Sequence, residues 1–158
     1  DEAFGIIKSS DGNYVIVGDT RSNDKDISQN NGASDLWVIK IAPSGNLLWE
    51  KTFGGTSFDA GRSISNTSDN GFLISGSSRS MDGDLTTNQG QNDVWVIKID
   101  SNGSLLWQKS LGGSNIDFAY DALELQDNSF IVIGESSSAD KDIQKNKGFT
   151  DLLIAKLK

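Results

Sequence analysis

An acidic loop with regularly spaced oxygen-bearing side chains occurs three times in this sequence. Counted from Asp24, such side chains fall at positions 1, 3, 5, 7 and 12 of the first copy, which are Asp24, Asp26, Ser28, Asn30 and Asp35. The second and third copies carry oxygen-bearing residues at the same positions. Because Ca²⁺ takes about six to eight oxygen ligands, a short segment with this spacing predicts a calcium site.

The candidate metal ligands are three aspartates and one asparagine in each copy. They are Asp24, Asp26, Asn30 and Asp35, then Asp82, Asp84, Asn88 and Asp93, then Asp140, Asp142, Asn146 and Asp151. The loop is not an EF-hand, because its sixth position lacks glycine and its twelfth is Asp instead of the longer Glu. The alternative interpretation is structural: Asp and Asn side chains accept hydrogen bonds from loop amides in Asx-turns.

The composition limits the other chemistry open to the chain. It contains no His and no Cys, which removes Ser-His-Asp and Cys-His catalysis and the usual ligands of zinc, copper and haem. The acidic residues recur in every copy, whereas the two carboxylates of a glycosidase belong to a single site. We therefore expect a protein that is not an enzyme.

The net charge narrows the range of partners. The chain has 14 Lys and Arg against 22 Asp and Glu, a formal charge of −8 at pH 7. Too few cations are present to neutralise a run of phosphates, so neither nucleic acid nor an anionic membrane surface is an expected partner. No apolar run approaches the roughly 20 residues needed to cross a bilayer, and membrane insertion is not expected.

The elements that position the acidic loops follow from a period of 58 residues. The segment 35–41 reads DLWVIKI, and it returns as DVWVIKI at 93–99 and as DLLIAKL at 151–157. A fixed period of this length indicates a repeat architecture. Most positions identical in all three copies hold residues typical of turns and loops. In the first copy these positions are Asp1, Asp11, Gly18, Ser22, Asp24, Asp26, Asn30, Gly32, Asp35 and Lys40.

Each copy is predicted to form four short antiparallel strands. Apolar residues at 6–8 and 14–17 flank the turn signal Asp11-Gly12, and those at 36–41 and 47–51 flank a turn at 43–46. Segment 37–41 is apolar on both faces, as expected of a sheet packed between two neighbours. We expect Lys40 and its copies to pair with a repeated Asp or to extend outward to solvent, rather than to anchor a ligand. The tryptophans at 37, 49, 95 and 107 are expected to pack between sheets.

Stacked units of four antiparallel strands are typical of β-propeller blades, and this all-β fold is our prediction. The blades are residues 1–58, 59–116 and 117–158, and the last lacks its fourth strand. An open β-solenoid is the alternative, although its repeats are usually shorter. Because closed propellers need about four to eight blades, either the chain is part of a longer propeller or copies associate to complete the ring.

The segment from Asp93 to Gly113, with Asp82-Gly83-Asp84 upstream, carries a family resemblance. It resembles the tandem β-propeller repeats of secreted and surface proteins of Bacteroidetes and related bacteria. A weaker similarity, to quinoprotein-dehydrogenase-like blades, rests on Gly45-Asn46-Leu47-Leu48-Trp49 and its copy. The first resemblance implies a propeller module of an exported protein, secreted or at the cell surface, generally without catalytic activity.

The predicted function is that of a non-enzymatic, exported propeller module that acts as a structural or protein-binding scaffold, with Ca²⁺ as a candidate cofactor. The alternative is a lectin-like propeller that binds carbohydrate between blades through aromatic residues and acidic-loop oxygens. A third hypothesis is an enzyme whose active site is completed by parts of the protein outside this sequence. The residues themselves do not identify the protein or glycan partner.

Overall fold

The computed structural model describes all of residues 1–158, and every regular element in it is a β-strand. The first sheet contains β1 (Glu2–Lys8), β2 (Tyr14–Thr20), β3 (Asp35–Ile41) and β4 (Leu47–Phe53). The second contains β5 (Asp59–Asn66), β6 (Phe72–Ser78), β7 (Asp93–Ile99) and β8 (Leu105–Leu111). The third contains β9 (Asp117–Glu124), β10 (Phe130–Ser136) and β11 (Asp151–Leu157). No helix long and apolar enough to cross a membrane is present.

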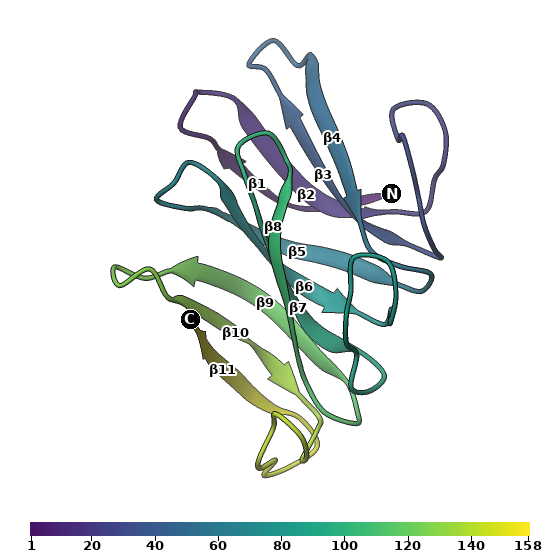
Figure 1. The fold of residues 1–158 in the computed structure, drawn as a ribbon, viewed down its shortest axis with the longest axis vertical. Helices are drawn as coiled ribbons and strands as arrows, with labels where there is room; N and C mark the ends of the chain where they lie inside the picture. Colours follow the sequence, from purple (N-terminus) through teal and green to yellow (C-terminus); the bar gives the residue numbers. More distant parts are fainter.

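Each sheet is an antiparallel meander in which strands adjacent in sequence are adjacent in space. The chain passes from β4 to β5 and from β8 to β9, so the last strand of one sheet leads into the first strand of the next. Strand β5 then packs against β1, β2 and β3, and β9 packs against β5, β6 and β7. Figure 1 shows the three sheets following one another from the top of the view to the bottom. The predicted all-β class and the predicted strand numbers, four, four and three, are confirmed.

Two apolar layers hold the three sheets together. The layer between the first two sheets is built from Val15, Val17, Leu36, Val38, Phe53, Ile64, Phe72, Ile74, Leu85, Trp95, Ile97 and Ile99. The layer between the second and third contains Leu73, Val94, Val96, Ala119, Ala122, Val132 and Leu153. Strand β7 contributes to both layers and is buried along its whole length. Its two apolar faces, visible already in the sequence, therefore face two different neighbouring sheets.

A β-bulge interrupts the first strand of every sheet at the same repeat position. The pairing skips Phe4 in β1, Arg62 in β5 and Tyr120 in β9, opposite Gly18, Gly76 and Gly134 respectively. A Cβ atom on any of these glycines would overlap a carbonyl oxygen of the bulged strand. The close approach of the two backbones explains why all three copies have glycine here, and the bulge redirects the side chain that it carries.

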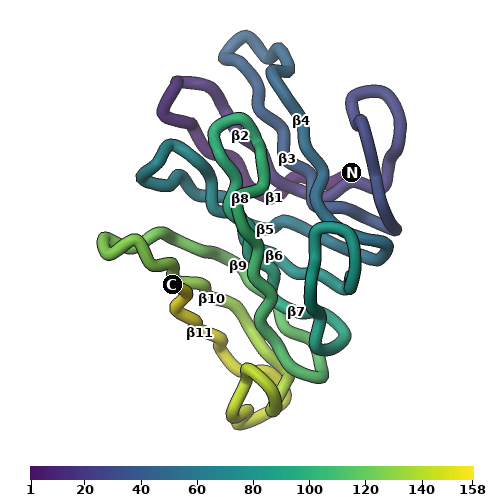
Figure 2. The backbone as a smooth tube through the Cα atoms, in the orientation of Figure 1, coloured from purple at the N-terminus to yellow at the C-terminus, as the bar shows by residue number.

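The three acidic loops leave their sheets at the end where the bulged first strands begin. Glu2 at the start of β1 pairs with Asp19 at the end of β2, and the loop to β3 follows directly. The same pairing joins Ala60 to Ser77 and Phe118 to Glu135 in the other sheets. Figure 2 shows these loops in purple-blue, teal and yellow-green, one after another along the side of the molecule.

Candidate functional site

A buried aspartate at the start of the first strand organises the crossover between sheets. Asp59 is fully buried and accepts hydrogen bonds from Ser78 Oγ, from Ser80 Oγ at 2.6 Å and from the Gly55 amide at 2.8 Å. Asp117 has the equivalent donors Ser136, Ser138 and Gly113. Each of these carboxylates therefore ties the end of the second strand to the turn that enters the sheet.

The first two aspartates of the acidic loop contact the same turn. Asp82 Oδ1 accepts a hydrogen bond from the Thr56 amide at 2.8 Å, and Asp84 Oδ2 accepts one from the Gly54 amide at 3.0 Å. In the third copy the contacts are Asp140 with the Ser114 amide at 2.8 Å and Asp142 with the Gly112 amide at 3.3 Å. The loops of the second and third sheets thus hold the crossovers from the preceding sheets.

The asparagine of each loop closes an Asx-turn and anchors the loop to the sheet. Asn88 Oδ1 accepts a hydrogen bond from the Gly90 amide at 2.9 Å, while its Nδ2 donates to the Ser78 carbonyl at 3.2 Å. Asn30 and Asn146 make the same two contacts in the other copies. These bonds are the ones that the structural interpretation of the spacing predicts.

The last aspartate of the loop is buried with one oxygen unpaired. Asp93 Oδ2 accepts a hydrogen bond from the Gln89 amide at 2.7 Å, but its Oδ1 has no partner. Likewise, Asp35 Oδ2 accepts a hydrogen bond from the Asn31 amide at 2.7 Å, and Asp35 Oδ1 has no partner. Burial raises the pKa of both carboxyls to about 6, because it disfavours their charged form. The negative charge of the buried aspartate in the next repeat, Asp59 or Asp117, raises the pKa further. Asp151, in the third copy, accepts from the Lys147 amide.

The unpaired oxygen faces the Gly-Gly crossover. A Cβ atom on Gly54 would lie 2.8 Å from Asp35 Oδ1 and 2.6 Å from Asp59 Oδ2. On Gly112 it would lie 2.5 Å from Asp93 Oδ1 and 2.8 Å from Asp117 Oδ2. Only glycine therefore fits at this position of the crossover, because carboxylates from two successive repeats lie against it.

The candidate calcium ligands are consequently divided among several contacts. In the second copy, the first two aspartates reach a crossover turn, the asparagine caps its own loop, and the last aspartate is directed towards the next repeat. No group of three or more acidic side chains is arranged to hold a metal ion. Calcium binding by these twelve residues stays a prediction.

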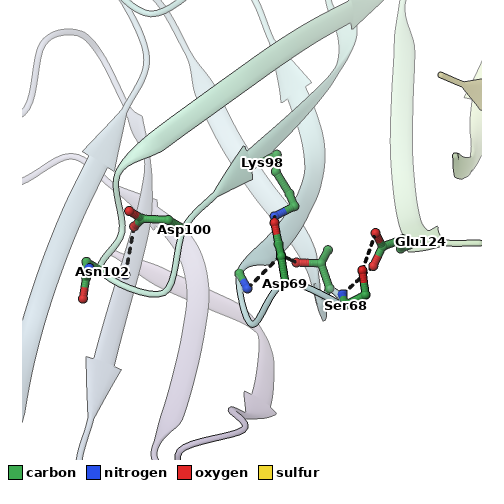
Figure 3. Close-up of polar contacts among 8 residues, drawn as sticks. Ser68, Asp69, Lys98, Asp100, Asn102 and Glu124 are labelled. Carbon is green, nitrogen blue, oxygen red and sulfur yellow. Dashed lines mark hydrogen bonds and ion pairs between the residues drawn. The ribbon is translucent and has the colours of Figure 1, made fainter. Parts of the chain in front are cut away.

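The repeated lysine forms the ion pair expected from the sequence. Lys98 Nζ lies 2.7 Å from Asp69 Oδ2 (Figure 3), and the Lys98 side chain is 4% exposed. Equivalent pairs join Lys40 to Asp11 at 2.7 Å and Lys156 to Asp127 at 2.8 Å. The Lys98 ammonium holds the pKa of Asp69 well below its usual range. The pairing is architectural, since it fastens the third strand to the turn between the first and second.

Three of the four tryptophans pack between sheets as expected, and Trp37 lies outside both apolar layers. Trp95 is fully buried, and its Nε1 donates to Gln108 Oε1 at 3.1 Å. Trp49 and Trp107 pack against the two apolar layers, and Trp37, half-buried, donates to Glu50 Oε2 at 3.0 Å. Their fixed places in the strands account for their regular spacing.

The sequence interpretation did not include Asp59 and Asp117 among the candidate site residues. A signal was available, because this Asp column and the Ser80/Ser138 column are identical in every copy. Identity alone does not say which of several repeated acids will be buried, however. That assignment required the packing of one sheet on the next.

Comparison with known proteins does not identify a family for this chain. No protein-family model matches the sequence, and no curated protein matches it. The assignment of a function therefore depends on the geometry of the chain itself.

Proposed function

We propose that this chain is a propeller-type repeat module with a scaffolding function, and that its end sheets bind further blades of the same kind. Three features support this proposal. The sheets are four-stranded meanders, the last strand of each leads into the first strand of the next, and the first strands β1, β5 and β9 pack side by side. Propeller blades share this arrangement. The resemblance to exported bacterial repeats supports a secreted or cell-surface location.

The observation that carries the proposal is the outer face of the third sheet. Leu152 and Ile154 in β11 are 75% and 62% exposed. Their equivalents in the other two sheets are all 0% exposed, because each is covered by the following sheet. These equivalents are Val94 and Val96 in β7 and Leu36 and Val38 in β3. The outer face of the third sheet thus has the chemistry of a face that another sheet covers.

The opposite end of the molecule carries the complementary face. Ile6 in β1 is 62% exposed, whereas its equivalents Ile64 and Ala122 are 7% and 3% exposed because they pack on a preceding sheet. A contact between the third sheet of one copy and the first sheet of another would therefore repeat the interfaces already present within the chain. Two copies joined in this way would supply six sheets, within the range of about four to eight in closed propellers. We assign the second copy as the occupant of both faces.

The contacts of the acidic residues support a scaffold over an enzyme. The carboxylates of Asp59, Asp82, Asp84 and Asp117 are engaged by backbone amides and serine hydroxyls of their own framework. The same bonds recur in successive repeats, as expected of groups that define the fold. Function in this proposal comes from surfaces that the framework presents.

Sedimentation velocity tests the proposal. We expect the chain to form a concentration-dependent dimer, and Ile154→Asp to convert it to a monomer without loss of folding. The matched control is Leu106→Asp, because Leu106 and its equivalent Leu48 are 53% and 49% exposed although both of their sheets have neighbours. A chain that stays monomeric at all concentrations would contradict the assignment, and so would a dimer that Leu106→Asp disrupts as strongly as Ile154→Asp.

A further inference from the structure

All three arginines of this acidic chain line one cavity. The cavity has a volume of about 240 Å³, and Arg21, Arg62 and Arg79 are among its lining residues. It also contacts the start of the first strand in each sheet, through Glu2, Ala60 and Phe118. The cavity therefore lies where the three first strands begin, at the end from which the acidic loops project.

A bulge places Arg62 in this position. Arg62 is the residue that the pairing of β5 skips, and its equivalents in the other bulges are Phe4 and Tyr120. The glycines opposite the bulges are identical in all copies, whereas the bulged residue differs in each. Bulges are frequent beside functional sites because they redirect a side chain. Here the framework is constant and the residue that it presents is variable, a pattern that suits ligand recognition.

Two of the three guanidinium groups lie over aromatic rings and have free donors. Arg62 Cζ lies 3.9 Å from the centre of the Phe4 ring, and Arg79 Cζ lies 5.8 Å from that of Phe58. Arg79 Nε donates to Asn92 Oδ1 at 2.5 Å, which orients the group and leaves both of its Nη atoms available. Stacking fixes the plane of a guanidinium while its edge stays open to a planar acceptor.

No carboxylate of the chain pairs with these arginines. The three ion pairs of the structure all join a lysine to an aspartate. Within the cavity, Asp59 already accepts from Ser78, Ser80 and Gly55. Glu2 and Asp19 also line the cavity, but neither forms an ion pair with an arginine, so the guanidinium groups are open to a carboxylate from outside the chain.

The rest of the lining defines the other features of a ligand. Phe58 and Phe118 provide apolar walls, while Glu2 and Asp19 can accept hydrogen bonds from hydroxyl or N–H groups. A volume of about 240 Å³ suits a molecule the size of one sugar ring or one amino acid. The complement of this lining is a small molecule with one carboxylate, hydroxyl or N–H donors and a short apolar surface.

From these contacts we infer that the cavity binds a small carboxylate-bearing ligand, with Arg62 and Arg79 holding the carboxylate and Arg21 adding positive charge. This site is independent of the scaffolding function and of the assembly through the end sheets. The same chemistry occurs in a hexuronic acid and in an acidic amino acid. Both are therefore needed as probes.

Titration of the full chain followed by ¹H–¹⁵N NMR tests the inference. Sodium glucuronate and N-acetylglutamate are the probes, and glucose and sodium sulfate at matched ionic strength are the controls. We expect saturable shifts of the Phe58 and Asn92 amides with at least one carboxylate and none with glucose. The carboxylate that binds more tightly identifies the source of the ligand.

Variants separate a built site from general charge attraction. Arg62→Met and Arg79→Met should each weaken binding about tenfold or more, because each removes charge-assisted hydrogen bonds to the carboxylate. The matched control, Lys8→Met, removes the same charge from an exposed residue at the other end of β1 and should leave the affinity unchanged. Thermal melting of each variant shows whether the fold is intact.

Three results would overturn the inference. One is the absence of saturable shifts with either carboxylate at about 10 mM, a concentration that detects millimolar affinity. Another is equal weakening by Lys8→Met and Arg62→Met, which would indicate a non-specific charge effect. The third is sulfate binding as tight as that of both carboxylates, which would remove the preference for a planar carboxylate. Carboxylate binding by a chain that proves monomeric would reject the assembly proposal alone.

Discussion

The replacement Asp69→Asn tests how much the buried end of a repeated ion pair contributes to stability. Lys98 Nζ contacts both oxygens of Asp69 (Figure 3), at 2.8 and 2.7 Å, and the Lys98 side chain is only 4% exposed. The replacement removes the negative charge but keeps the size of the side chain. A cation then stays in a place that water scarcely reaches, without a charged partner.

The expected loss follows from the burial of the two partners. Removing one member of a fully buried pair costs about 3–5 kcal/mol of the free energy of unfolding. Asp69 is 57% exposed, so solvent screens part of the interaction, and we expect a loss of about 2 kcal/mol at neutral pH. The chain supplies a matched control in Lys156 and Asp127, which lie 2.8 Å apart with exposures of 49% and 57%. Because Lys156 remains hydrated without its partner, Asp127→Asn should cost far less.

The pH dependence gives an independent check. Lys98 lowers the pKa of Asp69 in the folded chain below the value of about 4 expected when unfolded. The pair therefore stabilises the fold fully above about pH 4, and the stabilisation is lost as the pH falls towards the folded-state pKa. The difference in stability between the wild type and Asp69→Asn should accordingly be constant near neutral pH and shrink in acid.

Urea unfolding followed by tryptophan fluorescence measures both effects, because the chain has four tryptophans. Midpoints for the wild type, Asp69→Asn and Asp127→Asn at neutral pH give the two losses. Equal losses for the two variants would refute the reasoning, since burial of the lysine would then not determine the cost. A difference that persists undiminished in acid would refute the role of the Asp69 charge.

Two further predictions concern the acidic loops. The pKa of Asp93 is about 6 in the folded chain, so its protonated carboxyl favours the folded state. This contribution to stability is complete below about pH 4 and is lost as the pH rises through 6. In the presence of chelator, Asp93→Asn should therefore be more stable than the wild type at pH 8, by up to about 3 kcal/mol. The gain in the free energy of unfolding should be smallest in acid. An equal gain at every pH, measured by urea unfolding, would contradict this. If calcium binds the loops, millimolar Ca²⁺ should raise the melting temperature in a concentration-dependent way, and Asp26→Asn with Asp84→Asn should reduce that shift. Unchanged melting curves would remove the calcium prediction.

The hairpins and their strands could be predicted from the sequence because their signals are local. The turn signal Asp11-Gly12 and the alternation around it depend on residues a few positions apart, whose conformations are set by backbone sterics. Gly12, Asn70 and Asn128 occupy one repeat position, and all three adopt positive φ. Pairing of Lys98 with a repeated aspartate was also predictable, because a lysine in an apolar strand requires an acceptor, but only the structure identified that aspartate as Asp69.

Tertiary structure alone decided which polar groups of different repeats meet. Asp84 contacts Gly54, and Asp35 faces Asp59 across that glycine, although no pattern within one repeat links them. The cavity lined by Arg62 and Arg79 likewise exists only where several first strands and loops pack together. Periodicity establishes that equivalent residues have equivalent surroundings. It does not establish how far apart two sheets lie or which face of a loop is covered, because these depend on the summed packing of side chains from both sheets.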